Sequence, residues 1–343
     1  MAAVSSTRSG GPADGRTGPR SGEPAAASSA PSGAQHRLQR GDQELVVTEV
    51  GGTLRHYSVG GWEVLAGFGE EEQCPDYRGA QLAPWPNRLR DGRYYFDGDH
   101  QLPLNEAANR CAMHGLVCWE PWHVVRSAAS ELVLGCTLHP RTGYPFMLHL
   151  QTSYVLDGGG LTVTQGVTNS GPHRAPWGSG AHTYFSFGDA SIDSVVLHVP
   201  AEDWLPSDHR HLPMGRSRVG GSPYDFSTAR PIGTDVLDVA FSGLVRGADG
   251  RSTVSLRAAD RSVEVWMDSH HRCVMVFTSD TLSGRWRRAS VAVEPMTCPP
   301  DAFRNGQHLQ VLEPGQHFAA SWGVSPRLGT DAVAPLANRG RPG

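Results

Sequence analysis

The chain has 343 residues, of which 38% are hydrophobic and 19% charged, and its formal net charge is −4. This balance provides no basic surface for a phosphate backbone, so we expect no nucleic-acid partner. All 30 basic side chains are arginine. The absence of lysine excludes Schiff-base catalysis and the lysine of a phosphate-binding loop.

The chain contains no apolar run of about 20 residues, the length that a membrane span requires, and its first residues lack a secretory signal. We therefore expect no membrane contact and a cytoplasmic location. No cysteine lies in a C-x-x-C pair, which predicts reduced, mostly buried thiols. The cysteines are Cys74, Cys111, Cys118, Cys136, Cys273 and Cys298.

The two ends of the chain differ in composition from the region between them. Residues 1–37 are mainly Ser, Gly, Ala, Pro and Arg, without Leu, Ile or aromatic residues, and residues 327–343 resemble them. Such segments bury too little apolar surface to offset the entropy lost on ordering. We predict disordered tails at 1–37 and 327–343 around one domain at 38–326.

The predicted elements of this domain are strands. Residues 44–50 form the first, and residues 93–104 form a hairpin around the turn signal Asp97-Gly98. A second hairpin joins residues 146–156 to 161–167 through a glycine-rich turn. Further strands are predicted at 131–138, 194–199, 252–256, 263–267, 274–278 and 290–293.

Apolar and polar residues alternate with period two in many of these segments, and no window has sustained helical periodicity. There is also no G-x-G-x-x-G motif, which excludes a dinucleotide-binding fold. Many antiparallel strands joined by glycine-rich turns predict an all-β sandwich or barrel.

Two common catalytic arrangements are missing from the sequence. The pair His270-His271 is a poor metal chelate, because neighbouring residues of a strand face opposite ways, and H-E-x-x-H is absent. Gly178-Ser179-Gly180 lacks the spacing of a hydrolase nucleophile elbow. We therefore predict no metal site.

Three loop-like segments are unusual for a β protein: 79–92, with two prolines and Trp85, 177–185, with His182 among aromatic residues, and 291–303, where an apolar strand runs into Glu294. Partial desolvation at a strand end raises the pKa of a carboxyl group and makes it a better base. Composition alone favours the simpler interpretation, an exposed carboxylate.

The same segments carry a family resemblance. Together with two further motifs, they resemble signatures of the aldose 1-epimerase (galactose mutarotase) family, and all of these motifs come in the order that the family has. The motifs are Asn87-Arg88-Leu89, Asn109 to His114-Gly115-Leu116, His182-Thr183-Tyr184-Phe185, Leu237-Asp238-Val239-Ala240-Phe241, and Glu294-Pro295-Met296-Thr297 with Pro300-Asp301-Ala302-Phe303. They span nearly all of residues 45–325. The resemblance implies a large antiparallel β-sandwich with few short helices and an open sugar cleft.

The resemblance also implies site residues. Glu294 would act as general base on the C1 hydroxyl, His182 as general acid on the ring oxygen, and His114 as its helper. The remaining residues expected to bind the sugar are Arg88, Asp238, Asn87, Trp177 and Tyr184. Ring opening requires only that one proton be removed and another supplied, so no cofactor is expected.

Each residue has a simpler interpretation. In this interpretation His114 would be a buried structural histidine, Arg88 would be a surface charge, and Trp177, like Trp85, would be a core residue. Asp225 or Asp235 would then take the role of Asp238 in the site. These alternatives stay open on the sequence alone.

Two positions depart from the family pattern. Thr183 stands where proline is usual, and Met275 stands where many relatives carry glutamine. The loss of a polar ligand at Met275 leaves the sugar open. A free hexose is expected; the alternatives are an anionic sugar held by Arg88, Arg90 or Arg304, and a non-catalytic carbohydrate-binding protein. We expect a monomer or a homodimer.

Overall fold

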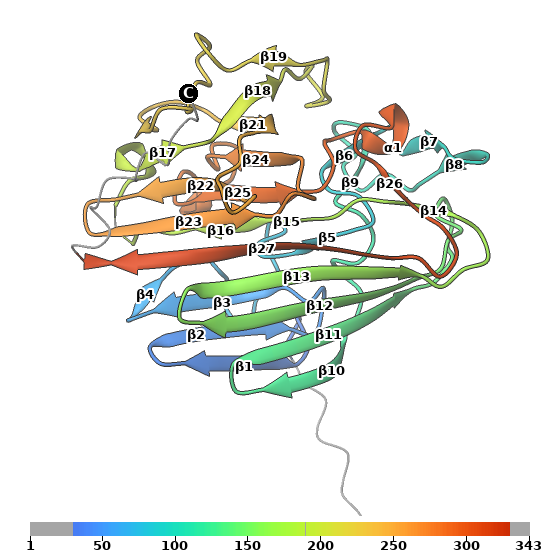
Figure 1. Cartoon of the computed structure of the whole chain (residues 1–343), viewed down its shortest axis with the longest axis horizontal. Coiled ribbons are helices and arrows are strands. Elements are labelled where there is room, and N and C mark those ends of the chain that lie inside the picture. Colours follow the sequence, from blue (N-terminus) through green and yellow to red (C-terminus); the bar gives the residue numbers. More distant parts are fainter. Residues whose placement is uncertain (1–29, 189, 330–343) are drawn as a thin grey trace, which may run out of the picture.

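The computed structural model describes residues 30–188 and 190–329, and strands dominate this part of the chain (Figure 1). The largest sheet has nine strands in the order β10-β11-β12-β13-β27-β23-β22-β17-β20. Their bounds are β10 (His123–Ala128), β11 (Glu131–Leu138), β12 (Leu148–Asp157), β13 (Gly160–Asn169), β17 (Val196–His198), β20 (Arg230–Pro231), β22 (Ser252–Arg257), β23 (Arg261–Met267) and β27 (His317–Leu328).

A second sheet has eight strands, in the order β19-β18-β21-β24-β25-β15-β5, with β16 also paired to β25. Their bounds are β5 (Gln81–Leu82), β15 (Gly180–Ala181), β16 (Thr183–Phe185), β18 (Ala201–Leu205), β19 (Ser217–Arg218), β21 (Asp238–Leu244), β24 (Cys273–Phe277) and β25 (Val291–Met296). The strand pairs within both sheets are antiparallel.

Smaller elements complete the described chain. A four-stranded sheet contains β1 (Gln35–Arg40), β2 (Gln43–Thr48), β3 (Leu54–Val59) and β4 (Trp62–Glu63). Three strand pairs are β6 (Arg88–Arg90) with β9 (Cys111–Met113), β7 (Arg93–Tyr95) with β8 (Asp99–Gln101), and β14 (Ala175–Trp177) with β26 (Gln310–Leu312). The short helices are α1 (Ala302–Asn305) and the 3-10 turns η1 (Ile192–Ser194) and η2 (Gly284–Trp286). Within the described ranges, no helix is long and apolar enough to cross a membrane.

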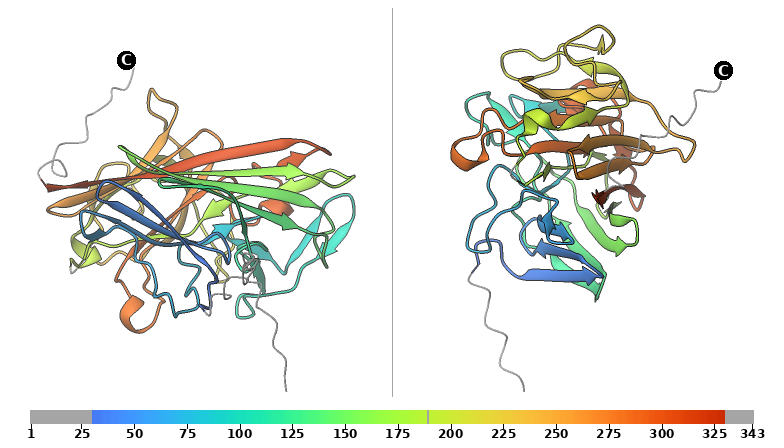
Figure 2. Two further views of the ribbon diagram at one scale, coloured as in Figure 1. Left: turned by 90° about the horizontal axis from the view of Figure 1, so that it is seen from below. Right: turned by 90° about the vertical axis from the view of Figure 1, so that its left-hand side faces the viewer.

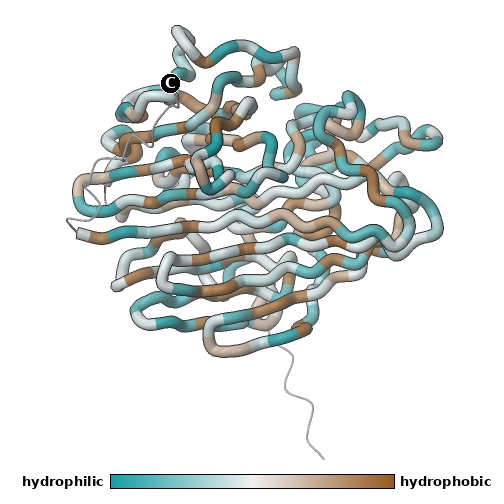
Figure 3. Tube along the Cα trace, in the orientation of Figure 1, coloured by the Kyte–Doolittle hydropathy of each residue, from teal (hydrophilic) through white to brown (hydrophobic). Residues whose placement is uncertain are grey.

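The sheets stack in layers, as the side views in Figure 2 show. The main core lies between them and takes Leu150 and Val163 from the nine-stranded sheet and Phe241 and Val293 from the eight-stranded sheet. Strand β12 shows why: its side chains alternate between buried and more exposed positions with period two. Figure 3 shows the same alternation of hydrophobic and hydrophilic residues along many strands.

The fold class predicted from the sequence is confirmed, and so are both hairpins, which are β7–β8 and β12–β13. The boundary of the domain differs from the prediction. Strand β1 starts at Gln35 and β27 ends at Leu328, so the ordered region extends beyond residues 38–326 at both ends. Residues 1–29 and 330–343, which make up most of the two predicted tails, lie outside the described residues.

Strand β27 lies in the middle of the nine-stranded sheet, between β13 and β23 (Figure 1). Val324 of β27 faces Leu161 on one side and Val265 on the other. The sequence did not indicate this strand because its segment, HFAASWGVSPRL, mixes small and polar residues with few branched apolar ones.

Candidate active site

The site is built on the face of the eight-stranded sheet that points away from the main core. Along β25 the side chains alternate, so Val293 enters the core and Glu294 lies on the opposite face. Met275 of β24 is directly opposite Glu294, and Ala240 of β21 is opposite Met275. This face, which also carries Asp238, is called the site face below.

Glu294 is 2% exposed, and its Oε1 lies 3.3 Å from Nε2 of His182. Its Oε2 has no hydrogen-bond partner among the described residues. Burial and the nearby charge of Asp238 raise the pKa of Glu294 to about 8, although Arg88 acts in the opposite direction. The simple interpretation of an exposed carboxylate is therefore excluded.

His182 lies between β15 and β16 and is held there by its backbone. Its N–H donates to the carbonyl of Ala80 at 3.1 Å, and the N–H of Gly79 donates to the carbonyl of His182 at 2.8 Å. The next residue, Thr183, donates its hydroxyl to the carbonyl of Val293 at 2.6 Å. Threonine in place of proline thus ties the histidine segment to the residue before Glu294.

A stack of planar groups supports the ring of His182. The ring of Tyr184 lies 4.9 Å from it, and the guanidinium of Arg78 lies between Tyr184 at 4.1 Å and Trp286 at 3.9 Å. Burial and the positive charge of Arg78 lower the pKa of His182 to about 3. Arg78 is 1% exposed, and no motif in the sequence pointed to it.

His114 follows β9 in the left-handed conformation, with φ of 62°, and faces Asn87, whose φ is 57°. The N–H of Asn87 donates to Nδ1 of His114 at 3.2 Å, and the N–H of His114 donates to the carbonyl of Asn87 at 2.9 Å. Because Nδ1 accepts, the neutral ring carries its proton on Nε2. That Nε2 has no partner in the described chain, so Asn87 prepares His114 as a hydrogen-bond donor.

Arg88 and Asp238, the residues expected to hold hydroxyls, each have a fixed partner. Nε and Nη2 of Arg88 donate to the carboxylate of Glu106 at 2.8–3.1 Å. Asp238 lies 3.0 Å from Nδ1 of His211. Burial alone would raise the pKa of Asp238, but the His211 hydrogen bond and the Arg88 charge lower it. The sequence indicated neither Glu106 nor His211, because both lie outside the recognised motifs.

The other carboxylates considered from the sequence are occupied elsewhere. Asp225 accepts hydrogen bonds from Ser227, and Asp235 forms an ion pair with Arg230 at 2.7 Å. Within residues 30–188 and 190–329, no cluster of His, Cys, Asp and Glu could hold a metal ion.

The aromatic residues predicted to contact sugar have supporting positions. Trp177 is 1% exposed and Trp85 is 3% exposed, and both belong to the main core, the alternative considered for them. Tyr184 is 2% exposed; its ring stacks on His182 and its hydroxyl donates to the carbonyl of Asp76 at 3.2 Å. Tyr77, whose ring lies 4.6 Å from that of His114, encloses the histidines instead.

A buried glutamate and histidine in contact, with pKa values moved in opposite directions, form a site on a β-sandwich that is suited to acid–base chemistry. Residues 35–325 match the family described as Aldose 1-epimerase. The chain belongs to this family, which makes it an isomerase that acts on sugars.

Similar proteins span most of the chain. The Escherichia coli K12 protein YihR is 31% identical over 83% of this chain and 91% of its own length. The galactose mutarotase of Homo sapiens is 27% identical over 75% of this chain and 81% of its own. Among solved structures, a putative aldose 1-epimerase of E. coli K12 superposes with a TM-score of 0.74 at 20% identity, covering 86% of this chain and 99% of that one.

Proposed function

We propose that the protein interconverts the α and β anomers of a free hexose of the glucose or galactose type by acid–base ring opening. The observation that carries the proposal is the buried contact of 3.3 Å between Glu294 and His182. The family supports sugar mutarotation in general, and the names of the mammalian relatives support a galactose-like sugar.

The chemistry requires a base and an acid that are close together, because the C1 hydroxyl and the ring oxygen share one carbon. Glu294 removes the proton of the C1 hydroxyl, the bond from C1 to the ring oxygen breaks, and His182 protonates that oxygen. The aldehyde turns about the C1–C2 bond, and the reverse steps close the ring on its other face. Nε2 of His114 donates a hydrogen bond near the ring oxygen.

The proton count of the Glu294–His182 pair fits this cycle. With pKa values of about 8 and about 3, the two groups together hold one proton over the pH range between these values. Moving that proton from the carboxyl group to the imidazole creates a base and an acid. The negative charge of Asp238 favours the protonated histidine, while Arg88 opposes it.

Arg88 and Asp238 orient the sugar through its hydroxyl groups. Glu106 and His211 fix these two side chains before the substrate arrives, which reduces the ordering cost of binding. Trp177 supports the fold from the core rather than contacting the sugar.

The proposal is tested by polarimetry, starting from pure α-glucose and pure α-galactose. We expect Glu294→Gln and His182→Asn each to lower the catalysed rate by at least ~10², the effect of one positioned acid or base. Glu313→Gln, at an exposed position, is the matched control and should keep the wild-type rate. Wild-type rates in both site variants would contradict the assignment, and sugar binding without catalysis by the wild type would indicate a binding protein.

A further inference from the structure

The ring of His182 is the inner end of a stack of planar side chains that reaches the protein surface. The ring of Tyr184 lies 4.9 Å from it, with the two planes 16° apart. The guanidinium of Arg78 lies 4.1 Å from the ring of Tyr184 and 3.9 Å from the ring of Trp286. Beyond Trp286 follows the guanidinium of Arg285, at 4.4 Å, whose side chain is 62% exposed. The stack therefore links the proposed acid to a surface arginine.

Arg78 is the unusual member of this stack, because its charge is buried without a carboxylate. Its Nη1 donates to the carbonyl of Ala66 at 3.0 Å and to Oγ of Ser290 at 3.5 Å, while Nε and Nη2 have no partner among the described residues. Burial lowers the pKa of Arg78, but an arginine side chain remains charged in proteins. A buried charge without an opposite charge destabilises the fold, so its presence indicates a role other than stability.

The backbone beside Arg78 holds the same histidine. The N–H of Gly79 donates to the carbonyl of His182 at 2.8 Å. Tyr184, the ring between Arg78 and His182, pairs with Ala292 of β25, the strand that carries the proposed base. The segment of Arg78 therefore fixes His182 twice, through its main chain and through the stack.

Ion pairs fix the outer end of the stack. Trp286 belongs to the turn η2, and the residue before it, Arg285, forms an ion pair with Glu72. After the turn, Arg288 forms an ion pair with Asp193 at 2.6 Å. These contacts hold Trp286 over the buried guanidinium.

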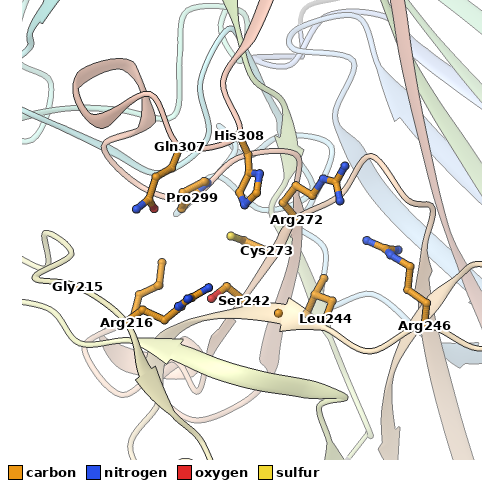
Figure 4. A pocket seen from close by; sticks show the side chains of 12 residues that line it. Gly215, Arg216, Ser242, Leu244, Arg246, Arg272, Cys273, Pro299, Gln307 and His308 are labelled. Carbon is orange, nitrogen blue, oxygen red and sulfur yellow. The ribbon is translucent and has the colours of Figure 1, made fainter.

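The enclosed position of Arg78 differs from that of arginines that can reach a ligand. Figure 4 shows Arg216, Arg246 and Arg272 around a hollow of about 580 Å³, and no member of the stack lines this hollow. Arg78 is buried against aromatic rings instead. It can therefore act on the reaction only through its neighbours.

Other titratable and charged groups also face His182. They come from the elements packed around it: Glu294 of β25, Asp238 of β21, Arg88 of β6, Tyr184 of β16, His114 after β9, and Tyr77 before β5. Burial lowers the pKa of His182 most, Arg78 and Arg88 lower it further, and Asp238 raises it. Arg88 is itself paired with Glu106. Of the two cations, Arg78 is therefore the one whose charge no carboxylate contacts in the described chain.

We propose that Arg78 is a positioning residue for the reaction, which acts through the ring of Tyr184 to hold His182 in place and to keep a second proton off the Glu294–His182 pair. The inference rests on the proposed function and deepens it. A pair with two protons has no base for the C1 hydroxyl, so the cycle would stop. Trp286 keeps water away from the guanidinium, which keeps its charge effective at His182.

The first test removes the charge of Arg78 and keeps the length of the side chain. Arg78→Met should fold, because an apolar side chain of similar size replaces a buried charge. The measurement is an NMR titration of protein with labelled histidines, in which the His182 signal is assigned by its loss in His182→Asn. We expect the His182 midpoint to lie at least about one pH unit higher in Arg78→Met than in the wild type.

The acid side of the kcat/KM profile should move in the same direction, because a second proton on the pair stops the cycle. Arg251→Met is the matched control. The guanidinium of Arg251 lies 3.8 Å from the ring of Trp266 on β23, in the other large sheet. This variant should change neither the His182 titration nor the kcat/KM profile.

The second test opens the outer end of the stack. Trp286→Ala should lower kcat by ~10-fold or more, because the histidine loses part of its orientation. KM should stay unchanged, since Arg78 and Tyr184 separate Trp286 from the site. Trp286→Phe keeps an aromatic face over Arg78 and should restore most of kcat. Polarimetry measures all three proteins.

The outcomes separate this inference from the proposed function. The same His182 midpoint in the wild type and in Arg78→Met overturns the inference, as does a Trp286→Ala variant that raises KM and keeps kcat. If the wild type accelerates anomer exchange of no sugar, the proposed function fails. The titration of His182 then still decides whether Arg78 keeps the second proton away.

Discussion

Glu294 and Asp238 are carboxylates on one face of one sheet, yet their pKa values move in opposite directions. Glu294 is buried beside a histidine that is itself neutral, and the charge of Arg88 offsets only part of the rise in pKa that desolvation and Asp238 cause. Asp238 gains a hydrogen bond from His211 and the attraction of Arg88. One carboxyl group can thereby exchange protons near neutrality, and the other stays ionised, as its proposed role in binding hydroxyls requires.

The pH dependence of the rate follows from the shared proton of Glu294 and His182. Below about pH 8 the pair holds one proton, and above it the pair loses this proton and no acid is left. We therefore expect kcat/KM to be level from mildly acidic to neutral pH and to fall about tenfold per unit well above pH 8. The measurement is polarimetry at constant ionic strength, with the spontaneous rate subtracted. A rate that instead rises through pH 8 would show that neutral His182 suffices and that Glu294 acts alone.

The raised pKa of Glu294 also predicts a gain in stability when it is replaced. In the unfolded chain the carboxyl group ionises near 4.5, and in the folded chain near 8. The folded state binds the extra proton, so stability is full below 4.5 and is lost as the pH rises to 8. Glu294→Gln should then be more stable than the wild type by up to about 3 kcal/mol at pH 7, and by less at pH 5.

Urea unfolding of both proteins at the two pH values measures this difference. A stability difference that does not change between pH 5 and pH 7 would mean that the carboxyl group has an ordinary pKa in the folded protein. Asp238→Asn serves as the contrast, because the lowered pKa of Asp238 predicts the opposite trend with pH.

At the residue scale, the sequence led to the residues that lie within recognisable motifs. Glu294, His182, His114, Arg88 and Asp238 do meet on one face of the fold. Their hydrogen-bond partners, Glu106 and His211, were not predicted, because a hydrogen bond between residues far apart in the chain leaves no local sequence pattern. Arg78 escaped for another reason: a guanidinium buried between aromatic rings looks in the sequence like any surface arginine.

At the scale of elements, the histidines are held by connections between strands rather than by the strands themselves. His114 leaves β9 in a left-handed turn, and Gly115 follows with φ of 77°. The backbone of Gly115 passes so close to Ala83 that an added Cβ would lie 2.0 Å from the carbonyl oxygen. Only glycine lets this loop approach segment 79–92 and place His114 beside Asn87.

Gly115→Ala should therefore destabilise the protein by about 3 kcal/mol or more, since steric overlap adds to the cost of a left-handed alanine. Gly250→Ala is the matched control: Gly250 has φ of 75°, and a Cβ there would meet nothing within 4 Å. The control should cost about 1 kcal/mol. Urea unfolding midpoints give both values, and equal midpoints for the two variants would contradict the close approach.

Elements with a strong local pattern were predictable, and those that depend on their neighbours were not. Hairpin β12–β13 alternates clearly and has a glycine-rich turn. Strand β10 is exposed along its whole length, and β21 combines Asp238, Ser242 and Gly243 with apolar residues. Both strands form because they pair with a neighbouring strand, and the periodicity of their own sequences does not reveal this pairing.

At the scale of the whole molecule, the reactivity of the cysteine thiols measures how well the packed structure excludes solvent. All six cysteines are free, and each is buried except Cys74, which is partly buried. Burial raises the pKa of Cys74 to about 12, so even this thiol is a poor nucleophile. We expect at most one thiol to react with a disulfide reagent in the native protein, and all six after unfolding in guanidinium. Fast reaction of several native thiols would show that the packing around them opens in solution.

The architecture of the whole molecule was predictable as a class but not in its topology. Period-two patterns and the lack of helical windows were sufficient to predict a sandwich. The order of strands in each sheet was not predictable, because pairings such as β13 with β27 join segments about 150 residues apart that have no pattern in common.

The central place of β27 has a consequence for the order of events during synthesis. This strand leaves the ribosome after every other described strand, and yet it joins the two halves of the nine-stranded sheet. Until it emerges, β13 and β23 present open edges, which are the usual starting points of aggregation. The largest sheet of the nascent chain therefore stays divided into two parts until this last strand has been synthesised. In cells short of chaperones, newly made chains should be lost more readily than mature ones.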